Sequence, residues 1–410
     1  MARSTSPDKR LISIGLLIGA AVGVWAGNRM REQQARQATR EITAPGEPPP
    51  LINWSQVRSV AVSLNRESSL EGVDREGLNG YYRELVERAV PLVAAYTGDE
   101  LPGTLDRVYA FDRIDWIDAN IDGFRDMFKP LEALNPLGEQ RGPRTISLLW
   151  GGLNQTVLSA EIGFLLGYLA RRVLGQYDLA LLGREPLTGG KLYFVQPNIT
   201  SVERALRLPD EDFRLWLTLH EVTHAFEFES HPWLRQHMNG MIERYFEFLG
   251  QDIEHLKRGI DGLRAFWDRA RSREGTNGSW IELVMTPEQR ALFNQMQATM
   301  SVVEGYSNHV MNAVGKDLIP SYEVIARRFE RRQHQRTPAE HLFARLTGLD
   351  IKMEQYRQGE AFVNHVVRER GHDFARRLWE GPWMLPTMDE IRNPDQWIER
   401  VSTAQHPAPL

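Results

Sequence analysis

The 410-residue sequence contains no cysteine. This absence excludes disulfide bonds, thiolate metal ligands and cysteine nucleophiles. The sequence also lacks an excess of positive charge, because its formal net charge is −5. Nothing in the bulk charge therefore points to a nucleic-acid partner. The remaining composition, 42% hydrophobic and 25% charged residues, is typical of a globular protein with a sizeable core.

Charge is missing locally as well, in a segment near the N-terminus. Residues 11–27 carry no charged side chain and follow the basic pair Lys9 and Arg10. As a helix they would span about 25 Å, slightly less than the hydrocarbon core of roughly 30 Å. Glycine recurs at every fourth position from Gly15 to Gly27, which gives the small-residue stripe that lets membrane helices approach closely. We therefore expect a retained single-pass membrane anchor.

A cleaved signal peptide is the alternative interpretation of this segment. Basic residues are nearly balanced on its two sides, so the sequence does not indicate which side of the cell membrane the rest of the chain occupies. Residues 1–10 are predicted as an N-terminal tail and 28–50 as a charged, proline-rich linker. The folded body then covers residues 51–403, and residues 404–410 form a disordered tail.

Most of the body has the residue pattern of helices. One amphipathic helix is predicted over residues 81–96, with a kink or break at Pro91 and an end near Gly98. The best strand candidate is 191–196, which either offers its edge to an extended substrate or is a plain core strand. The basic run at 327–336 is interpreted as a solvated helix face, with contact to anionic lipid as the alternative. The fold class is thus mainly α with a minor β element.

The pentapeptide His220-Glu221-Val222-Thr223-His224 lies within a stretch that lacks glycine and proline and is predicted to form a buried helix. Residues four apart share one helix face, so the two imidazoles can bind one metal ion. Glu221 lies beside them and can take a proton from water. This is the HExxH arrangement of zinc hydrolases. The alternative is a pair of helix histidines bonded to neighbouring groups.

A catalytic zinc needs a third protein ligand. Glu304 is the strongest candidate, because it is the lone carboxylate of a second helical segment and is preceded by apolar residues. The arrangement is that of gluzincins, and a structural salt bridge is the alternative role. His231 lies eleven positions after His220, one beyond the HExxHxxGxxH spacing, and Glu227 stands where that motif has glycine. We therefore do not expect His231 to be a ligand.

Three further residues of the second segment are candidates for the site. Asn308 lies four positions after Glu304, on the same helix face, where it could hydrogen-bond a ligand. Tyr306 and His309 could stabilise the oxyanion that forms when water attacks a carbonyl, or could equally be satisfied core residues.

With these residues in view, the sequence resembles a bacterial family of zincin-like proteins. Its members are often labelled zinc-dependent metalloproteases or deazaflavin-coenzyme-biosynthesis-associated proteins. The segments that carry the resemblance are 112–120, 173–178, 195–199, 212–216, 220–224, 232–235, 304–305, 348–359 and 385–387. The resemblance covers about residues 51–403 and leaves the predicted membrane segment outside.

The resemblance implies one mostly α zincin-like domain with a His, His, Glu zinc site. We expect a membrane-anchored metallopeptidase that binds a peptide or protein substrate and uses a zinc-activated water. A metal-holding structural or partner-binding protein is the alternative, as is a non-peptide hydrolase on the same fold. The presence of Glu221 favours a catalytic zinc site over a structural one, because a purely structural zinc does not need a base. No residue indicates a deazaflavin pocket, and a fold resemblance alone assigns no substrate.

Overall fold

The computed structural model describes residues 50–68, 70–133, 144–177, 190–257, 285–334 and 349–403. The chain divides into two compact units, one of Met1–Val57 with Asn135–Ile162 and one of Arg58–Leu134 with Gly163–Leu410. The predicted anchor at 11–27 and both predicted tails lie outside the described residues, as do nearly all of the linker and the end of the basic run. None of the helices in the described ranges combines the length and hydrophobicity needed to cross a bilayer.

The described chain is mainly helical, as the sequence predicts. Its longer helices, in chain order, are α2 (Trp54–Ser63), α3 (Arg75–Thr97), α4 (Arg113–Ala133), α5 (Arg144–Ala170), α6 (Gln196–Leu206), α7 (Asp210–Glu229), α8 (Pro232–Lys257), α11 (Pro287–Leu318), α12 (Tyr322–His334), α14 (Leu349–Arg370) and α17 (Pro394–Thr403). Short helices are η1 (Arg66–Ser68), α15 (His372–Ala375), η3 (Arg376–Trp379), η4 (Pro382–Met384) and α16 (Met388–Arg392).

Helix α3 shows how local residues and packing together set an element's length. Asp74 caps its N-terminus by accepting a hydrogen bond from the Gly77 amide, and Gly98 ends it with a left-handed φ of 70°. The predicted end near Gly98 is therefore confirmed. The helix continues through Pro91 without ending there. Buried residues on both sides of Pro91, such as Ala89 and Val93, supply packing that offsets the hydrogen bond that proline cannot make.

The small β element is a sheet of three strands, β1 (Arg107–Phe111), β2 (Gly175–Tyr177) and β3 (Lys191–Val195), in the order β1-β3-β2. Strand β3 pairs parallel with β1 and antiparallel with β2. The strand predicted at 191–196 is thus present over Lys191–Val195, whereas Gln196 begins helix α6. Both edges of β3 are paired, however, so it is a core strand and offers no edge to a substrate. Among the described strands, β1 and β2 have the edge positions.

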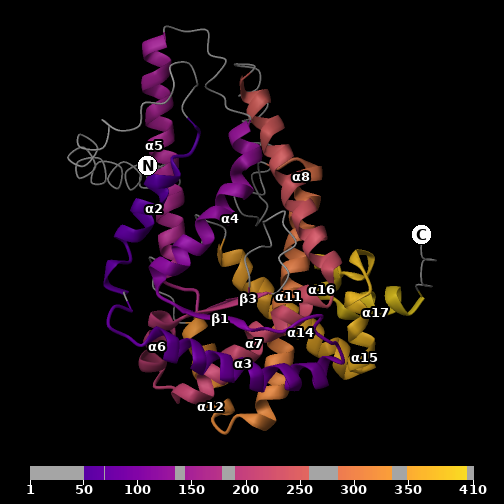
Figure 1. Cartoon of the computed structure of the whole chain (residues 1–410). Coiled ribbons are helices and arrows are strands. Elements are labelled where there is room, and N and C mark those ends of the chain that lie inside the picture. Colours follow the sequence, from indigo (N-terminus) through magenta and orange to yellow (C-terminus); the bar gives the residue numbers. More distant parts are fainter. Residues whose placement is uncertain are drawn as a thin grey trace, which may run out of the picture. The chain divides into compact units, whose positions relative to one another are not determined.

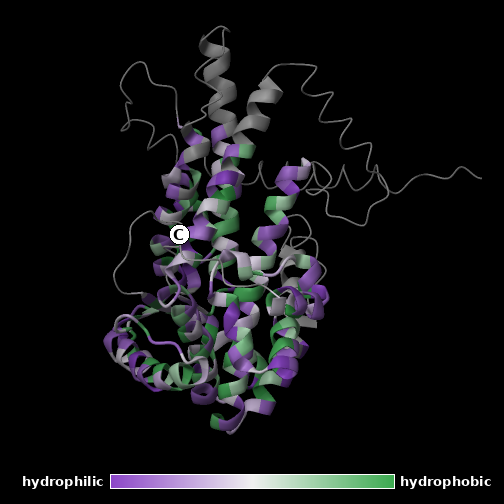
Figure 2. Ribbon diagram, turned by 90° about the vertical axis from the view of Figure 1, so that its right-hand side faces the viewer, coloured by the Kyte–Doolittle hydropathy of each residue, from purple (hydrophilic) through white to green (hydrophobic). Residues whose placement is uncertain are grey.

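Within the larger unit, helices cover both faces of this sheet (Figure 1). Helices α3 and α7 run side by side beneath it, and Tyr82 of α3 stacks on Phe194 of β3 with ring centroids 4.3 Å apart. On the opposite face, Trp116 of α4 donates a hydrogen bond to Gln176 of β2 at 2.6 Å. Hydrophobic and hydrophilic residues share the same helices (Figure 2), and α3 buries its apolar side, whereas most of α7 is buried. The sheet and α7 are consequently fixed against each other.

Helices α11 and α14 cross at two glycines. A Cβ added to Gly305 would lie 2.3 Å from the carbonyl carbon of Gly359, and one added to Gly359 would lie 1.8 Å from the carbonyl oxygen of Ser301. Only glycine permits backbones to approach so closely. The crossing therefore fixes α11 at the residue that directly follows Glu304.

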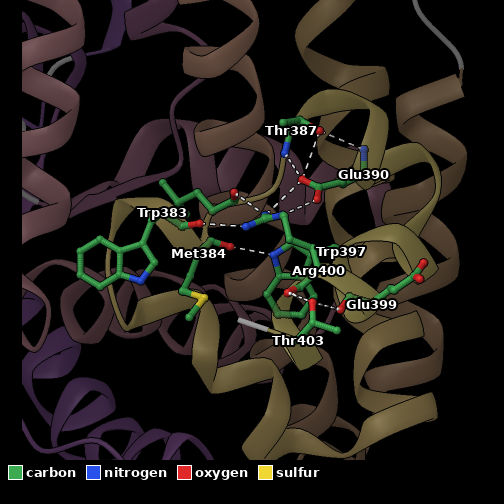
Figure 3. Close-up of polar contacts among 9 residues, drawn as sticks. Trp383, Met384, Thr387, Glu390, Trp397, Glu399, Arg400 and Thr403 are labelled. Atoms are coloured by element: carbon green, nitrogen blue, oxygen red, sulfur yellow. Dashed lines mark hydrogen bonds and ion pairs between the residues drawn. The ribbon is translucent and has the colours of Figure 1, made fainter. Parts of the chain in front are cut away.

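The C-terminal helices are fastened by a polar cluster around Arg400 (Figure 3). The Arg400 guanidinium donates to the Glu390 carboxylate at 2.6 Å and to the Trp383 carbonyl at 2.9 Å, while the Trp397 indole donates to the Met384 carbonyl at 2.7 Å. Glu390 also accepts from the Thr387 amide, which caps α16. These hydrogen bonds stabilise the C-terminal helices, of which α16 and α17 pack against α14, and α14 in turn packs against α11.

Candidate metal centre

Helix α7 carries the first part of the site. Three acidic residues in its first turn, Asp210, Glu211 and Asp212, suit the positive end of the helix dipole. From Phe213 onward most of its side chains are buried, so packing holds the helix rigidly between the sheet and α11. A pair of histidines four residues apart is therefore presented from a well-anchored backbone.

The structure brings together the three residues predicted to bind a metal. The Nε2 atoms of His220 and His224 lie 3.1 Å apart. The Glu304 Oε2 atom lies 3.6 Å from the His220 Nε2 and 3.9 Å from the His224 Nε2. Their side chains keep 17%, 12% and 26% of their surface exposed, so the cluster is partly open to solvent. The three donors form the one such group found in the described residues.

These separations fit a tetrahedral zinc. Ligands at about 2.0–2.1 Å from such an ion lie about 3.3 Å from one another. The observed distances between donor atoms, from 3.1 to 3.9 Å, bracket that value. Two imidazoles and one carboxylate are also the donor set of a catalytic zinc, which leaves a fourth position for water. The residues present therefore fit the ion that the sequence predicts.

Glu221 is the carboxylate nearest to the pair of histidines in sequence, and it is buried. Its Oε2 atom accepts a hydrogen bond from the backbone amide of Tyr177 at 3.1 Å. Gly175 lies against the same side chain, because a Cβ there would be 2.6 Å from the Glu221 Oε1. Burial raises the pKa of Glu221, and the neighbouring His220 and His224 counteract part of that rise.

The amide that binds Glu221 lies on the outer edge of β2. The Val195 amide donates to the Leu174 carbonyl, so this pair is hydrogen-bonded, and the next such pair along the ladder is Gln176 with Tyr193. Tyr177 directly follows Gln176 along the strand, so its backbone amide must point away from β3. The structure places the Glu221 carboxylate on that outward side, where it accepts the hydrogen bond. The outward side of β2 and the predicted base therefore meet directly.

A second buried carboxylate contacts His224. Glu227 Oε2 lies 2.7 Å from the His224 Nδ1 and accepts a hydrogen bond from the Ser307 hydroxyl at 3.1 Å. Burial lowers the pKa of His224, but the charge and hydrogen bond of Glu227 outweigh it and raise the pKa to about 9. Sequence reasoning did not identify either partner. The signal for Glu227 was its position three residues after His224 on one helix face.

The other candidates from the sequence lie in different surroundings. His309 has both ring nitrogens engaged, Nε2 with the Tyr96 hydroxyl at 2.7 Å and Nδ1 with the Asn364 side-chain oxygen at 2.5 Å. Tyr306 is fully buried, with its hydroxyl 3.5 Å from the His372 Nε2. Among the described contacts neither residue touches the metal-binding group, so their oxyanion role stays a prediction.

The last two candidates from the sequence are Asn308 and His231. Asn308 follows Glu304 by one turn of α11 and is half-buried; its hydrogen bond to a ligand also stays a prediction. His231 stands between α7 and α8, where its Nε2 lies 3.5 Å from the Asp99 Oδ2 and its ring stacks on Trp379. These contacts account for His231 without a metal.

Comparisons with known proteins bear on the whole body of the chain. The model of a family described as zincin-like metallopeptidase matches residues 52–398. A crystal structure of a protein from Chloroflexus aurantiacus, provisionally described as a hydrolase with a novel fold, is 42% identical in sequence. The match covers 86% of this chain and 100% of that one, with a TM-score of 0.64. No curated protein matches the chain.

Proposed function

Because the chain belongs to the zincin-like metallopeptidase family, we propose that it is a zinc-dependent hydrolase of HExxH, gluzincin-like type that cleaves peptide bonds. The observation that carries this proposal is the convergence of His220, His224 and Glu304, whose donor atoms lie 3.1 to 3.9 Å apart. Partial solvent exposure of all three supports a catalytic site over a closed structural one. The buried Glu221 beside them supplies the base that hydrolysis needs.

His220, His224 and Glu304 would hold the ion through their Nε2, Nε2 and Oε2 atoms. When bound there, zinc supplies a Lewis acid that polarises the substrate carbonyl and makes water a stronger nucleophile. Each histidine must use a neutral Nε2 for this purpose. For His224 the carboxylate of Glu227 holds a proton on Nδ1, so the Nε2 proton is the one that the ring would give up to bind an ion.

Glu221 would handle the protons of the reaction. Its carboxylate accepts one from the attacking water as the oxygen–carbon bond forms, and returns it to the leaving amine nitrogen as the carbon–nitrogen bond breaks. Burial raises its pKa, which is the direction needed for a group that holds a proton near neutral pH. The Tyr177 amide acts in the opposite direction, because its hydrogen bond favours the charged carboxylate.

The family match supports a peptide as the substrate. The described strands do not add to this choice near the base, because Tyr177 and Gly175 on the outward side of β2 already lie against Glu221 of α7.

Metal analysis followed by activity profiling tests the function. Purified protein should contain about one zinc per chain, as the ligand count implies, and His220→Ala with His224→Ala should remove it. The zinc-loaded protein is then incubated with a mixed peptide library and cleavage is read by mass spectrometry. Full metal occupancy in the double variant would rule out the site. A zinc-loaded protein that cleaves no peptide would favour the non-catalytic or non-peptide alternatives.

We also propose that residues 11–27 anchor the protein in the cell membrane. The uncharged, glycine-striped sequence supports this. Full-length protein should remain with membranes after a carbonate wash, whereas a chain that begins near Leu51 should not. A mature N-terminus at Gly27, found by mass spectrometry, would favour a cleaved signal peptide instead.

A further inference from the structure

The His224 Nδ1, the Glu227 carboxylate and the Ser307 hydroxyl lie within hydrogen-bond distance of one another. Glu227 Oε2 lies 2.7 Å from the His224 Nδ1, and the Ser307 Oγ lies 3.0 Å from the same nitrogen. The Ser307 hydroxyl also donates to the Glu227 Oε2 at 3.1 Å. Glu227 keeps only 1% of its surface exposed and Ser307 none. A buried carboxylate is costly unless it is paired, so this placement calls for a reason.

The other histidine of the pair has no comparable support. The His220 Nδ1 is buried without a hydrogen-bond partner among the described residues. For His224, by contrast, a proton on Nδ1 satisfies both Glu227 and Ser307. The lone pair then lies on Nε2, the atom that faces His220 and Glu304. The contacts thus select one of the two imidazole tautomers, the one able to bind a metal through Nε2.

Ser307 also links two helices, because it belongs to a different helix from His224 and Glu227. It follows Glu304 by three residues on α11, whereas His224 and Glu227 lie on α7. The hydrogen bonds therefore join the two helices within one turn of the carboxylate that completes the site. A shift of α11 along α7 would break these hydrogen bonds and would also move Glu304 relative to His220 and His224.

We propose that Glu227 and Ser307 act as a positioning pair, which fixes the tautomer of His224 and holds the α11 carboxylate in register with the histidines. This inference rests on the metal site proposed above. Neither residue would touch the ion. Their contribution is to keep the three donor atoms in place before the ion arrives, and that contribution should appear in metal affinity.

Zinc affinity of the Glu227→Gln and Ser307→Ala variants tests the pair. Both changes are small, and Gln keeps the volume of Glu. Each should weaken zinc binding about 10- to 100-fold, the usual effect of removing an outer partner of a ligand. Because the two residues act on one ring, the double variant should lose less than the product of the single losses. Affinity is measured by competition with a chromophoric chelator.

Two matched controls separate positioning from a general loss of packing. Glu203→Gln removes a buried carboxylate paired with Arg214 at 2.7 Å, and Ser301→Ala removes a buried α11 hydroxyl bonded to the Gln297 carbonyl. Both should keep zinc affinity within about threefold of wild type, since the described contacts of these side chains are with Arg214 and Gln297 and not with His224. Equal losses in the controls would overturn the proposal, as would unchanged affinity in Glu227→Gln and Ser307→Ala.

Nitrogen NMR of histidine-labelled wild-type protein gives an independent readout. In the zinc-loaded protein the His224 Nδ1 should be protonated and the Nε2 should carry the metal-bound shift. A metal-bound Nδ1 would overturn the proposal, even if the variants proved too unstable to titrate. A wild-type protein that binds no zinc would instead refute the site itself. A positive wild-type result with insensitive variants refutes the positioning pair alone.

Discussion

The backbone amide of Tyr177 donates a hydrogen bond to the Glu221 carboxylate at 3.1 Å. This contact joins the outer edge of strand β2 to the residue proposed as the base. It means that strand β2 positions Glu221. Changes in β2 should therefore affect turnover without affecting the metal ligands.

Gly175→Ala is the most selective such change. The new Cβ would lie 2.6 Å from the Glu221 Oε1 and 2.7 Å from its Cγ, so this side chain must move, whereas no metal ligand is among the three atoms nearest to that Cβ. We expect zinc content to stay at the wild-type level and turnover to fall about 10²-fold, because small misplacements of a catalytic group have effects of that size. Gly103→Ala is the control, since nothing lies within 4 Å of its added Cβ. Wild-type turnover by Gly175→Ala would show that Glu221 reacts from another position.

The third ligand is tested by comparing two variants. Glu304→Ala removes an oxygen that lies 3.6 Å from the His220 Nε2 and should weaken zinc binding by more than the roughly 10- to 100-fold that follows loss of an outer partner. His231→Ala removes one of the two partners of Asp99, the other being Arg376, and should leave zinc affinity nearly unchanged. Equilibrium dialysis of both variants at one pH supplies the comparison. An unaffected Glu304→Ala, or a His231→Ala that loses its metal, would contradict the assignment.

A pH effect on stability follows from His309. Burial lowers its pKa, while the hydrogen bond with Asn364 and the charge of Glu360 counteract part of that change. The unfolded chain takes up this proton near pH 6.5 and the folded chain does so only at lower pH. The free energy of unfolding should therefore fall as pH drops below about 6.5. His372, beside Tyr96 and also of lowered pKa, acts in the same direction.

Urea denaturation at pH 7.5 and 5.5 measures this effect, with a chelator present so that acid release of metal makes no contribution. His309→Gln cannot take up the proton, so its free energy of unfolding should change less between the two pH values than that of wild type. An equal change in both proteins would mean that His309 makes no contribution to the pH dependence.

Sequence reasoning succeeded where the determining information is local or chemical. The spacing of His220 and His224 places both rings on one helix face, and the expense of a lone buried carboxylate led to Glu304 across a long stretch of chain. The sequence alone could not show whether strand 191–196 lies at the edge or in the centre of the sheet. That position depends on pairing with residues 107–111 and 175–177, which are distant in sequence. Ser307 was missed for the same reason, since its partners lie on another helix.

Glu221→Gln tests most directly whether Glu221 is the base of a zinc-dependent hydrolase. The amide keeps the size of the carboxylate but cannot accept a proton. Zinc content and the turnover of a peptide found in the library screen are measured on the same samples, because lost metal would mimic lost catalysis. We predict full zinc content with turnover reduced about 10²-fold or more, as is usual when a general base is removed. A zinc-loaded variant that cleaves the peptide as fast as wild type would contradict the account.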